Sequence, residues 1–594
     1  MGLDKDLYGD NGMHCKAYNT LVDLLEYRSS AHPDKTAYIF LDFLSGSGMD
    51  YRETSITNGE LYTNARKIAE RLERYNGCGE RAIMLYPPGI DYIVAFYACL
   101  LAGIIAVPSY PPMSEKFLSQ VKSIVADATP KFVLSVKTVS THLKPLMENC
   151  INLRDVVWFD TDGTDEKTGE EFDRRKYTPY STAFLQYTSG ATAHPRGVKV
   201  THENLLHNLS LIERCFGHHA DSCGVIWLPP YHDMGLIGGI LQPLYAGFPV
   251  VLMSPLSFLK NPLRWLWAIS NYKATTSGGP NFAYDLCIRK ITPEQKNMLN
   301  LSSWDLAFNG AEPIKPDTLE RFVRTFAECG FREESFYPCY GLAESTLIVT
   351  GGIKENLPKT CGFSKNDLLG NRVTELNESD ESHKKYVGCG NALHKGEVII
   401  VDTELSKECM QGKIGEIWVR SPSVAAGYWN NELETARVFN ACLADTGEGP
   451  YLRTGDLGFI HDEELFVAGR LKDVIIIRGE NYYPQDIETV AEQSNHLLRK
   501  GCGAAFTVGN DGETRIVLVQ EVAHLEEKIQ MDSVIQDIRQ AVALYQGLYI
   551  DALALIQCYT IPKTTSGKIQ RNECRTQYLS GTLEIVWHDT TINN

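Results

Sequence analysis

The sequence predicts an α/β protein with a large amino-terminal domain of layered sheets and helices and a small, mobile α+β domain at the carboxyl end. Its 594 residues are too many for one compact hydrophobic core, so two or more domains are expected. Through most of residues 1–350, short apolar segments alternate with helical patterns, which is typical of parallel sheets covered by helices. The expected strands are 81–86, 131–135, 155–159, 183–185, 224–228, 250–253, 397–401 and 415–419.

Composition and charge argue against several classes of protein. Hydrophobic residues make up 43% of the chain and charged residues 22%, as in ordinary globular proteins. The net charge of −17 argues against general nucleic-acid binding and against attraction to an anionic membrane surface. The 16 cysteines form no CxxC pair, so neither a zinc ribbon nor a disulfide framework is expected. Free thiols and a polar amino terminus, unlike a signal peptide, favour a cytoplasmic protein.

One uncharged stretch, 92–114, is long enough to span a bilayer. Gly103 interrupts it, however, and three prolines follow between 108 and 112. These residues favour a buried helix over 91–102 and a short strand over 104–107. No transmembrane segment is therefore expected.

The loop at 187–198 is the most informative segment for function. Its sequence, Tyr-Thr-Ser-Gly-Ala-Thr-Ala-His-Pro-Arg-Gly-Val, lies between an expected strand at 183–185 and a helix expected from Thr201 onward. Small residues let the backbone approach a polyphosphate, and amides and hydroxyls then donate to its oxygens. Arg196 adds a charge that persists at any working pH. The loop is not a GxxxxGK[ST] motif, so by itself it fits a phosphate site and a surface turn about equally.

The segment Trp227-Leu-Pro-Pro-Tyr-His-Asp-Met-Gly235 joins a strand to a loop that two prolines stiffen, and it sets His232 beside Asp233. A metal pair or a Ser-His-Asp triad needs partners at other spacings, and none is evident. A hydrogen-bonded structural histidine and a functional histidine both remain open.

Two small-residue loops, at 309–313 and 337–346, each carry a carboxylate. Tyr340 offers a flat face for a nucleotide base. Glu344 offers hard oxygen atoms, which Mg²⁺ prefers beside phosphates.

Two further loops lie in the last third of the chain. The sequence Tyr451-Leu-Arg-Thr-Gly-Asp-Leu-Gly458 predicts Asp456 on a turn, where a carboxylate can accept from ribose hydroxyls. The sequence Pro562-Lys-Thr-Thr-Ser-Gly-Lys-Ile-Gln-Arg571 is a basic loop. Taken singly, such loops are more often solvated turns than binding sites, so none of them identifies a function by itself.

Residues 352–386 break the alternation of strands and helices, with few aliphatic runs and many polar residues. They are interpreted as a surface insertion, whether a lid, a docking element or a simple loop. Glycine and charge at 469–473 then mark a boundary. The predicted domains are 1–470, which carries the insertion, and 471–594.

In this order, these segments resemble the adenylate-forming (acyl-activating) superfamily over nearly the whole chain. Arg196 stands where that family usually has lysine, and Ala191 where it usually has serine or threonine. The charge is kept and one hydroxyl is lost. The resemblance implies a phosphate loop at 187–198, an adenine and Mg²⁺ segment at 337–346, a ribose-binding turn at 451–458, a hinge at 469–473 and a catalytic-lysine loop at 562–571.

The same resemblance implies that ATP is a substrate, that Mg²⁺ lies on Glu344 and Thr188, and that charge neutralisation does most of the catalysis. Lys568 would contact both the incoming carboxylate and the α-phosphate, while His232 would lie near the acyl carbonyl. Tyr340 would stack on adenine. The implied catalytic residues are Lys568, His232 and Glu344, and the implied nucleotide-binding residues are Thr188, Ser189, Gly190, Thr192, Arg196, Gly310, Ala311, Glu312, Tyr340, Gly341, Asp456 and Arg470.

Within the superfamily the chain is similar to fatty acyl-AMP ligases, on the loop 228–235, the segment 278–284 and the insertion 352–386. This likeness implies activation of a medium- or long-chain fatty acid. The acyl group would then pass to the phosphopantetheine of an acyl carrier protein, or of a polyketide or nonribosomal synthase carrier domain, in trans. In that family the insertion packs against the hinged domain and accompanies loss of coenzyme A use. Segments 227–236 and 277–284 would line the acyl slot.

Two other functions remain open. A long-chain fatty acyl-CoA synthetase shares every residue of the first half-reaction. A non-catalytic adenylate-binding scaffold is the other, but the presence of Glu344, Asp456 and Lys568 together argues against it.

The helix expected over 525–547 contains Asp532-Ser533, a pair found at the modification serine of carrier proteins. Gln530 stands where such a motif has glycine. An ordinary helix is therefore predicted there, with no fused carrier.

Overall fold

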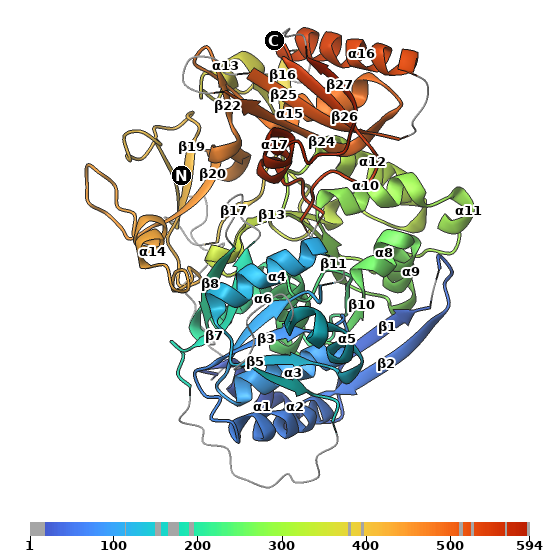
Figure 1. The fold of residues 1–594 in the computed structure, drawn as a ribbon, viewed down its shortest axis with the longest axis vertical. Coiled ribbons are helices and arrows are strands. Elements are labelled where there is room, and N and C mark those ends of the chain that lie inside the picture. The colour runs from blue at the N-terminus through green and yellow to red at the C-terminus, as the bar shows by residue number, and fades with distance from the viewer. Residues whose placement is uncertain are drawn as a thin grey trace, which may run out of the picture.

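The structure is a computed structural model, and it supports the predicted fold class. Figure 1 shows most of the larger amino-terminal part, blue to green, below the smaller carboxyl-terminal part in red, with the orange β20 (Leu452–His461) and α14 (Glu432–Phe439) at the left and α13 (Lys365–Leu369) and β16 (His383–Val387) at the top beside the carboxyl-terminal part. The described residues are 18–44, 46–112, 115–148, 156–163, 177–188, 195–377, 380, 382–393, 397–509, 515–523, 528–564 and 567–590.

Within these ranges, six strands form the first sheet of the large domain, in the order β6-β5-β3-β4-β7-β8. All neighbours are parallel except β7 and β8, which are antiparallel. All of these strands except β8 confirm predicted strands, with ends that differ by one or two residues at most sites. The strands of this sheet are β3 (Arg81–Leu85), β4 (Ile105–Ser109), β5 (Phe132–Ser135), β6 (Val157–Asp160), β7 (Thr182–Thr188) and β8 (Arg196–Thr201).

A second sheet has nine strands among the described residues, in the order β17-β14-β13-β12-β11-β9-β10-β1-β2. Its central strands, from β13 to β1, run parallel, and the edge strands are antiparallel. Ligands of open parallel sheets bind outside the carboxyl ends of the strands, so the loops after β11, β12 and β13 are the expected site. The strands are β1 (Thr36–Phe43), β2 (Tyr51–Thr57), β9 (Gly224–Ile226), β10 (Val250–Met253), β11 (Thr276–Gly279), β12 (Leu306–Asn309), β13 (Phe336–Gly341), β14 (Ile348–Gly351) and β17 (Asn391–Ala392).

Two helices join these sheets. Helix α3 (Ile90–Leu101) contacts β3 and β4 of one sheet and β1 and β2 of the other, which explains why it is apolar on all sides. It confirms the buried helix predicted in the uncharged stretch. Helix α6 (His202–Phe216) begins at Thr201, whose hydroxyl accepts from the Asn204 amide (3.2 Å), and it contacts β8 and β14.

Further helices pack around the two sheets, and most residues of η2 (Met234–Leu241) are buried. In the part of the chain that the structure describes, no helix is long and apolar enough to cross a membrane. The helices are α1 (Leu21–Ala31), α2 (Asn58–Glu73), α4 (Glu115–Ala128), α5 (Lys137–Glu148), the π-helix η2 (Met234–Leu241), α7 (Gln242–Ala246), α8 (Pro255–Lys260), α9 (Leu263–Tyr272), α10 (Asn281–Lys290), α11 (Pro293–Lys296), α12 (Pro316–Phe326), α14 (Glu432–Phe439) and the 3₁₀ turns Ala327–Cys329, Glu333–Ser335 and Ala343–Ser345.

The insertion at 352–386 is more ordered than a simple loop. Its strands β15 (Thr360–Ser364) and β16 (His383–Val387) pair antiparallel, with α13 (Lys365–Leu369) between them. Phe363 is fully buried against Phe459 and Phe466 of a small sheet that follows in the sequence. That sheet contains β18 (Val398–Val401), β19 (Gly415–Val419), β20 (Leu452–His461) and β21 (Glu464–Arg470).

The carboxyl-terminal part builds its own hydrophobic clusters around residues from Ile475 onward. Asp532 and Ser533 lie inside α16, as an ordinary helix requires. Its elements are the 3₁₀ turn Leu471–Asp473, β22 (Ile475–Ile477), β23 (Glu480–Tyr482), α15 (Pro484–Ser494), β24 (Leu498–Val508), β25 (Arg515–Val522), α16 (Lys528–Gln546), β26 (Ala552–Ile556), α17 (Arg571–Ser580) and β27 (Ile585–Thr590).

Two local predictions were wrong. The loop at 187–198 does not lead directly into a helix, because Arg196 begins strand β8, which pairs back onto β7 before α6 starts. Asp456 does not lie on a turn but inside strand β20, opposite Arg470 of β21. The glycine that suggested a turn, Gly455, has a φ of 70° and sits next to an irregularity in the strand pairing.

Candidate active site

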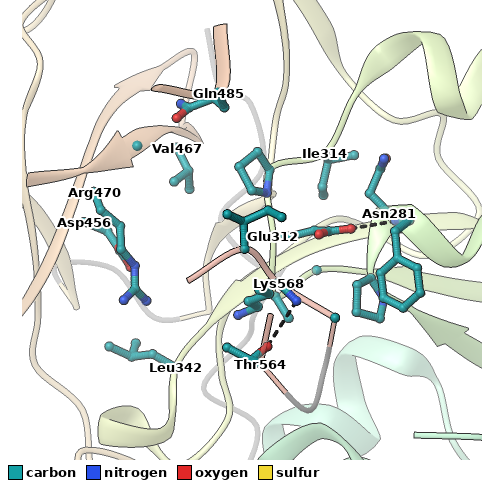
Figure 2. Close-up of a pocket in the computed structure, with 18 of the residues that line it drawn as sticks. Asn281, Glu312, Ile314, Leu342, Asp456, Val467, Arg470, Gln485, Thr564 and Lys568 are labelled. Atoms are coloured by element: carbon teal, nitrogen blue, oxygen red, sulfur yellow. Dashed lines mark hydrogen bonds and ion pairs between the residues drawn. The ribbon is translucent and has the colours of Figure 1, made fainter. Parts of the chain in front are cut away.

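A cleft of about 2730 Å³ opens between the large and the small domain. Every predicted site residue that the structure describes lines it. Figure 2 shows Lys568 near Glu312, with Asp456 and Arg470 across the pocket. Three predicted residues, Ser189, Gly190 and Thr192, lie outside the described residues. The cleft brings together Thr188, Arg196, His232, Gly310, Ala311, Glu312, Tyr340, Gly341, Glu344, Asp456, Arg470 and Lys568.

The loop 562–571 carries Lys568 from the small domain into this cleft. The Lys568 amide donates to the Thr564 hydroxyl (3.1 Å), and the Thr564 amide donates back to the Lys568 carbonyl (2.8 Å). Gly567 has a φ of +88°, and a Cβ there would lie 3.2 Å from the Phe282 ring of the large domain. Glycine therefore lets the loop turn close to the large domain.

Arg571, at the end of the loop, anchors it to the rest of the small domain. Its guanidinium contacts both carboxylate oxygens of Glu488 at 2.7 Å and one oxygen of Asp473 at 3.3 Å. Asp473 ends the 3₁₀ turn that follows β21. The position of Lys568 is thus coupled to the segment that joins the two domains.

Carboxylates face Lys568 from the large domain. Glu312 accepts from the Phe282 amide (2.6 Å), and burial raises the pKa of Glu312. Asp233 contacts His232 Nδ1 at 2.5 Å and accepts from the Met234 amide (2.7 Å). Burial alone would raise the pKa of Asp233, but the charges of His232 and Lys568 outweigh it and hold that pKa below its usual value.

Burial, followed by the nearby Arg470, lowers the pKa of Lys568 below that of a free lysine. Asp233, Glu312 and Asp456 oppose this shift. A lysine held among carboxylates and one arginine is positioned to neutralise an additional anion, because its ammonium group has lost part of its hydration shell.

A chain of three polar side chains crosses the other side of the cleft. The Tyr340 hydroxyl donates to Asp456 (2.8 Å), and the other oxygen of Asp456 contacts Arg470 Nε at 3.2 Å. Strand β13 positions Tyr340, while β20 and β21 position the other two in register. The Tyr340 ring is buried, so its orientation is fixed by packing as well as by this bond.

Glu344 follows Tyr340 in a 3₁₀ turn and accepts from the Tyr428 hydroxyl (3.0 Å). Burial raises the pKa of Glu344. Arg196 stacks over the Tyr428 ring at 5.2 Å and forms an ion pair with Glu434 at 2.8 Å. Arg196 is therefore bound to α14, and Thr188 lies opposite it in the β7–β8 pairing.

Close backbone packing explains two glycines of the site. A Cβ on Gly310 would lie 2.8 Å from the Cys339 carbonyl, and one on Gly341 would overlap the Leu347 carbonyl at 1.8 Å. Ala311 has a φ of 69°, which bends the chain between Gly310 and Glu312. Small residues thus let the loops after β12 and β13 pass each other at the edge of the cleft.

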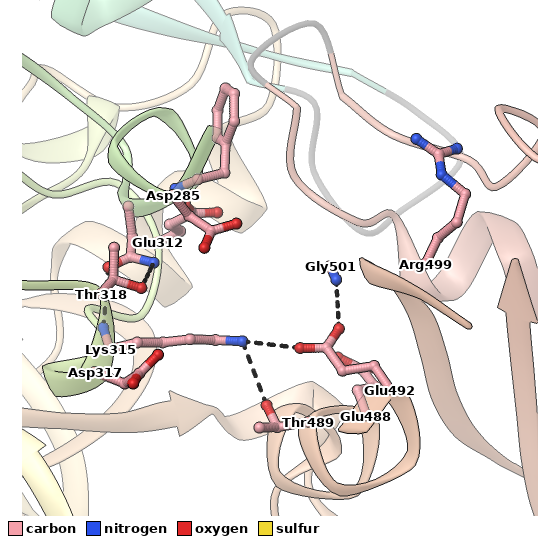
Figure 3. Close-up of polar contacts among 12 residues, drawn as sticks. Asp285, Glu312, Lys315, Asp317, Thr318, Glu488, Thr489, Glu492, Arg499 and Gly501 are labelled. Atoms are coloured by element: carbon pink, nitrogen blue, oxygen red, sulfur yellow. Dashed lines mark hydrogen bonds and ion pairs between the residues drawn. The ribbon is translucent and has the colours of Figure 1, made fainter. Parts of the chain in front are cut away.

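Polar contacts hold the small domain against the large one. Lys315 donates to Glu492 (3.3 Å) and Thr489 (3.5 Å) of α15, and Glu492 also accepts from the Gly501 amide (Figure 3). On the insertion, Lys384 contacts Asp486 of α15 at 2.6 Å. Burial would lower the pKa of Lys384, but Asp486 and Tyr386 outweigh it and raise that pKa.

Sequence reasoning did not find Tyr428, Glu434 or the charge interaction between Asp233 and Lys568. Their partners Glu344 and Arg196 lie far away in the sequence, so no spacing reveals these contacts. The Gly-Tyr-Trp triplet at 427–429, followed by an acidic helix start, was the available signal.

Comparison with known proteins agrees with this geometry. The family described as "AMP-binding enzyme" matches residues 25–429, and the family described as "Disco-interacting protein 2-like, AMP domain" matches residues 472–588. The medium-chain-fatty-acid–[acyl-carrier-protein] ligase JamA of Moorena producens (strain JHB) is 41% identical, with 96% of each chain covered. The corresponding ligase TtuA of Teredinibacter turnerae is 34% identical, over 96% of this chain and 94% of TtuA.

Solved structures give the same result. The crystal structure of a fatty acid AMP ligase from Legionella pneumophila has 41% sequence identity and a TM-score of 0.75, covering 98% of this chain and 99% of that one. A fatty acyl-adenylate ligase from L. pneumophila, in complex with acyl adenylate and pyrophosphate, has 40% identity and a TM-score of 0.73, with 98% and 99% covered. These matches confirm the resemblance to fatty acyl-AMP ligases. With a family match over most of the chain and relatives aligned along nearly all of it, this protein belongs to the AMP-binding enzyme family.

Proposed function

We propose that this protein is a fatty acyl-AMP ligase, which activates a medium- or long-chain fatty acid with ATP and releases pyrophosphate. The acyl group then passes to the phosphopantetheine thiol of an acyl carrier protein, or of a polyketide or nonribosomal synthase carrier domain, acting in trans. The observation that carries the proposal is the position of Lys568, which the small domain places in the same cleft as Glu312, Glu344 and Asp456. The ligases JamA and TtuA support the substrate and the acceptor.

The first half-reaction joins two anions, so positioning and charge neutralisation are its main requirements. A carboxylate oxygen of the fatty acid attacks the α-phosphorus of ATP, and the bond from that phosphorus to the bridging oxygen breaks. Pyrophosphate leaves with the electron pair of that bond. Lys568 is proposed to contact both the carboxylate and an α-phosphate oxygen. His232, oriented by Asp233, is proposed to lie near the acyl carbonyl.

The nucleotide is proposed to occupy the side of the cleft lined by Tyr340 and Asp456. The ring of Tyr340 faces adenine, and the backbone at Gly310, Ala311 and Glu312 and at Gly341 frames the edge of the base. The Asp456 carboxylate accepts from the ribose hydroxyls, and the Arg470 guanidinium donates to them. The existing bond from Tyr340 to Asp456 supports this, because it holds the carboxylate in place before the nucleotide arrives.

The phosphates are proposed to lie against Thr188, Ser189, Gly190, Thr192 and Arg196. Of these residues, Thr188 and Arg196 line the cleft opposite one another. Arg196 pairs with Glu434, but Arg437 also donates two hydrogen bonds to that carboxylate, so Glu434 keeps a partner when Arg196 contacts pyrophosphate.

Glu344 and Thr188 fit a magnesium ion. Both present hard oxygen atoms to the same cleft, and the raised pKa of Glu344 reflects a buried carboxylate whose charge is incompletely compensated. When bound, Mg²⁺ supplies positive charge beside the phosphates. Glu344, held by Tyr428, and the hydroxyl of Thr188 are the proposed ligands.

The domain boundary is proposed at 470/471, which gives domains 1–470 and 471–594 and a hinge within the 3₁₀ turn Leu471–Asp473. The separate hydrophobic clusters from Ile475 onward support this division. The free state of every described cysteine supports a cytoplasmic location.

The insertion 352–386 is proposed to favour the carrier protein over coenzyme A, because it restrains the rotation that thioester formation requires. Lys384 bridges to Asp486, and Leu369 packs against the hydrophobic cluster of the small domain. Lys384→Ala is expected to raise acyl-CoA formation several-fold without lowering acyl-adenylate formation. The exposed neighbour Lys385→Ala is the control, and equal effects of the two variants would contradict the role of the bridge.

The acyl chain is proposed to occupy an apolar extension of the cleft, which we name the acyl tunnel. Trp227, Leu228, Pro280 and Phe282 line its entrance, as the segments 227–236 and 277–284 predict. Further in, it is lined by Ile212, Gly224, Ile226, Gly238, Val250 and Phe308.

The experiment is fatty-acid-dependent exchange of labelled pyrophosphate into ATP, measured with saturated acids from hexanoic to hexadecanoic. Exchange that depends on a fatty acid is expected. If none of these acids supports exchange, the proposed function is wrong.

A further inference from the structure

The acyl tunnel runs along the strands of the nine-stranded sheet, from their carboxyl ends toward their amino ends. Gly224 of β9 pairs in register with Val250 of β10 and with Thr276 of β11, and all three line the cleft. They lie at the start of their strands, whereas Leu228 and Pro280 lie beyond the strand ends, where the nucleotide side begins. The tunnel therefore has a measurable depth.

From Gly224 to Leu228 the chain takes four residue steps, of which the first two lie in β9, so the path is at most about 13 Å long, the length of a straight hydrocarbon of about ten carbons. Gly238 keeps this path open. A Cβ on Gly238 of η2 would meet no atom within 4 Å except a Leu347 methyl at 3.5 Å. Its neighbour Gly239, by contrast, packs against Ile226 of the sheet at 2.8 Å. Gly238 thus borders the tunnel, while Gly239 faces the sheet.

His218 lies at the inner end of this path, in the segment that follows α6. Its ring packs edge-on against Phe248 (4.8 Å) and Phe216 (5.3 Å), which also line the cleft. Its Nε2 lies 3.1 Å from the Thr276 hydroxyl. Two aromatic rings and a strand residue therefore fix the ring across the end of the tunnel.

The other ring nitrogen is also engaged. With the Gln242 amide turned so that its nitrogen donates to the Leu209 carbonyl (3.0 Å), its oxygen faces His218 Nδ1 at 3.3 Å. Nδ1 then donates to Gln242, and Nε2 accepts from Thr276. Burial lowers the pKa of His218 to about 3, so the ring stays neutral at working pH. A neutral, fully bonded and buried ring is a rigid wall rather than a mobile side chain.

We infer that His218 closes the acyl tunnel and sets the longest fatty acid that the protein activates, at about ten carbons. This inference rests on the proposed function, and it specifies the substrate as a medium-chain acid. His218 does not touch the reacting atoms; it acts as a specificity residue at the opposite end of the chain.

The test is the chain-length profile of pyrophosphate exchange, from hexanoic to hexadecanoic acid, for the unmodified protein and three variants. The unmodified protein is expected to prefer acids near decanoic acid and to lose activity steeply beyond them. His218→Ala is expected to raise the rate with tetradecanoic acid, relative to decanoic acid, by about tenfold or more, because further methylenes gain a buried site. His219→Ala is the matched control. The His219 side chain, next to His218 in the sequence, is exposed, so the chain-length profile of this variant should not change.

Gly238→Leu changes the same property in the opposite direction. A leucine there should fill the tunnel and shift the preferred acid to a shorter chain. Leucine also has a higher helix propensity than glycine, so the substitution should not destabilise the helix backbone. This variant keeps the inference testable if His218→Ala does not fold. Unchanged profiles in the folded variants would overturn the role of His218. Absence of exchange with every acid in the unmodified protein would instead refute the proposed function.

Discussion

The two ends of the cleft are built in different ways. At the nucleotide end, charged and hydroxyl side chains bond to one another, as in the chain from Tyr340 through Asp456 to Arg470. At the acyl end, residues from β9, β10, β11 and η2, apolar except for Thr276, line the cleft, and His218 is the residue proposed to close it. The nucleotide end is thus suited to neutralise charge, and the acyl end is suited to select fatty acids by chain length.

Because the two ends are built differently, substitutions at them should change the reaction rates in different ways. A change at the nucleotide end should alter the rate by the same factor for every fatty acid, because the chemistry there is common to all of them. A change at the acyl end should alter the relative rates of different acids, because only chain length is sensed there.

Lys568→Ala should lower the rate of acyl-adenylate formation by about 10²–10³-fold, the cost of losing one preorganised charge at a transition state. The loss should be equal for octanoic and decanoic acids. Lys563→Ala, in the same loop, is the matched control, because Lys563 donates to the Gly501 carbonyl (2.9 Å) within the small domain. A loss of rate that depended strongly on chain length would show that the nucleotide end and the acyl end do not act independently. A near-normal rate would refute the role of Lys568.

Glu344→Ala should raise the Mg²⁺ concentration needed for half-maximal rate by about tenfold to a hundredfold, since a hard oxygen ligand is lost. Tyr428→Phe removes only the hydrogen bond to Glu344, and its effect should be smaller. Titration of the exchange rate with Mg²⁺ measures both. An unchanged metal requirement in Glu344→Ala would mean that the cation lies elsewhere.

Tyr340→Phe should raise KM for ATP by about tenfold, because Asp456 loses a buried hydrogen bond that holds it toward the ribose. The preferred chain length should not change. A variant with normal KM for ATP and a shifted chain-length profile would contradict the proposed arrangement of the cleft.

The dependence of kcat/KM on pH should show the lowered pKa of Lys568. Because this pKa lies below the free value of 10.5, Lys568 loses its proton, and the enzyme its activity, at a lower pH than a free lysine would. The basic limb of the profile is measured between pH 7 and pH 10.5. It should be unchanged in Lys563→Ala, and a limb at or above the value of a free lysine would argue against Lys568 as the titrating group.

The same contrast explains how much the sequence could predict. The nucleotide end consists of short contiguous motifs, so Glu344, Asp456 and Lys568 could be chosen without a structure, as could the alternating strands. The strand position of Asp456 was missed, because a glycine with positive φ occurs in bulged strands as well as in turns. The ion pair from Arg196 to Glu434 was missed because it joins segments far apart in the sequence.

The inner end of the acyl tunnel carried no motif, unlike its entrance at 227–236 and 277–284. His218 depends on Thr276 and Gln242, which lie on separate elements, and no local pattern connects them. Gly238 differs from Gly239 only in what each one faces. Such positions follow from packing between elements and become visible only when the sheet register is known.

The central claim is that this protein forms an acyl-adenylate and delivers the acyl group to a carrier protein rather than to coenzyme A. The most direct measurement supplies the unmodified protein with ATP, Mg²⁺, decanoic acid and equal concentrations of coenzyme A and a phosphopantetheinylated acyl carrier protein, and identifies the acyl products by mass. The proposed function predicts acyl-adenylate and acyl carrier protein thioester, with little acyl-CoA. Acyl-CoA as the main product would contradict it and favour an acyl-CoA synthetase.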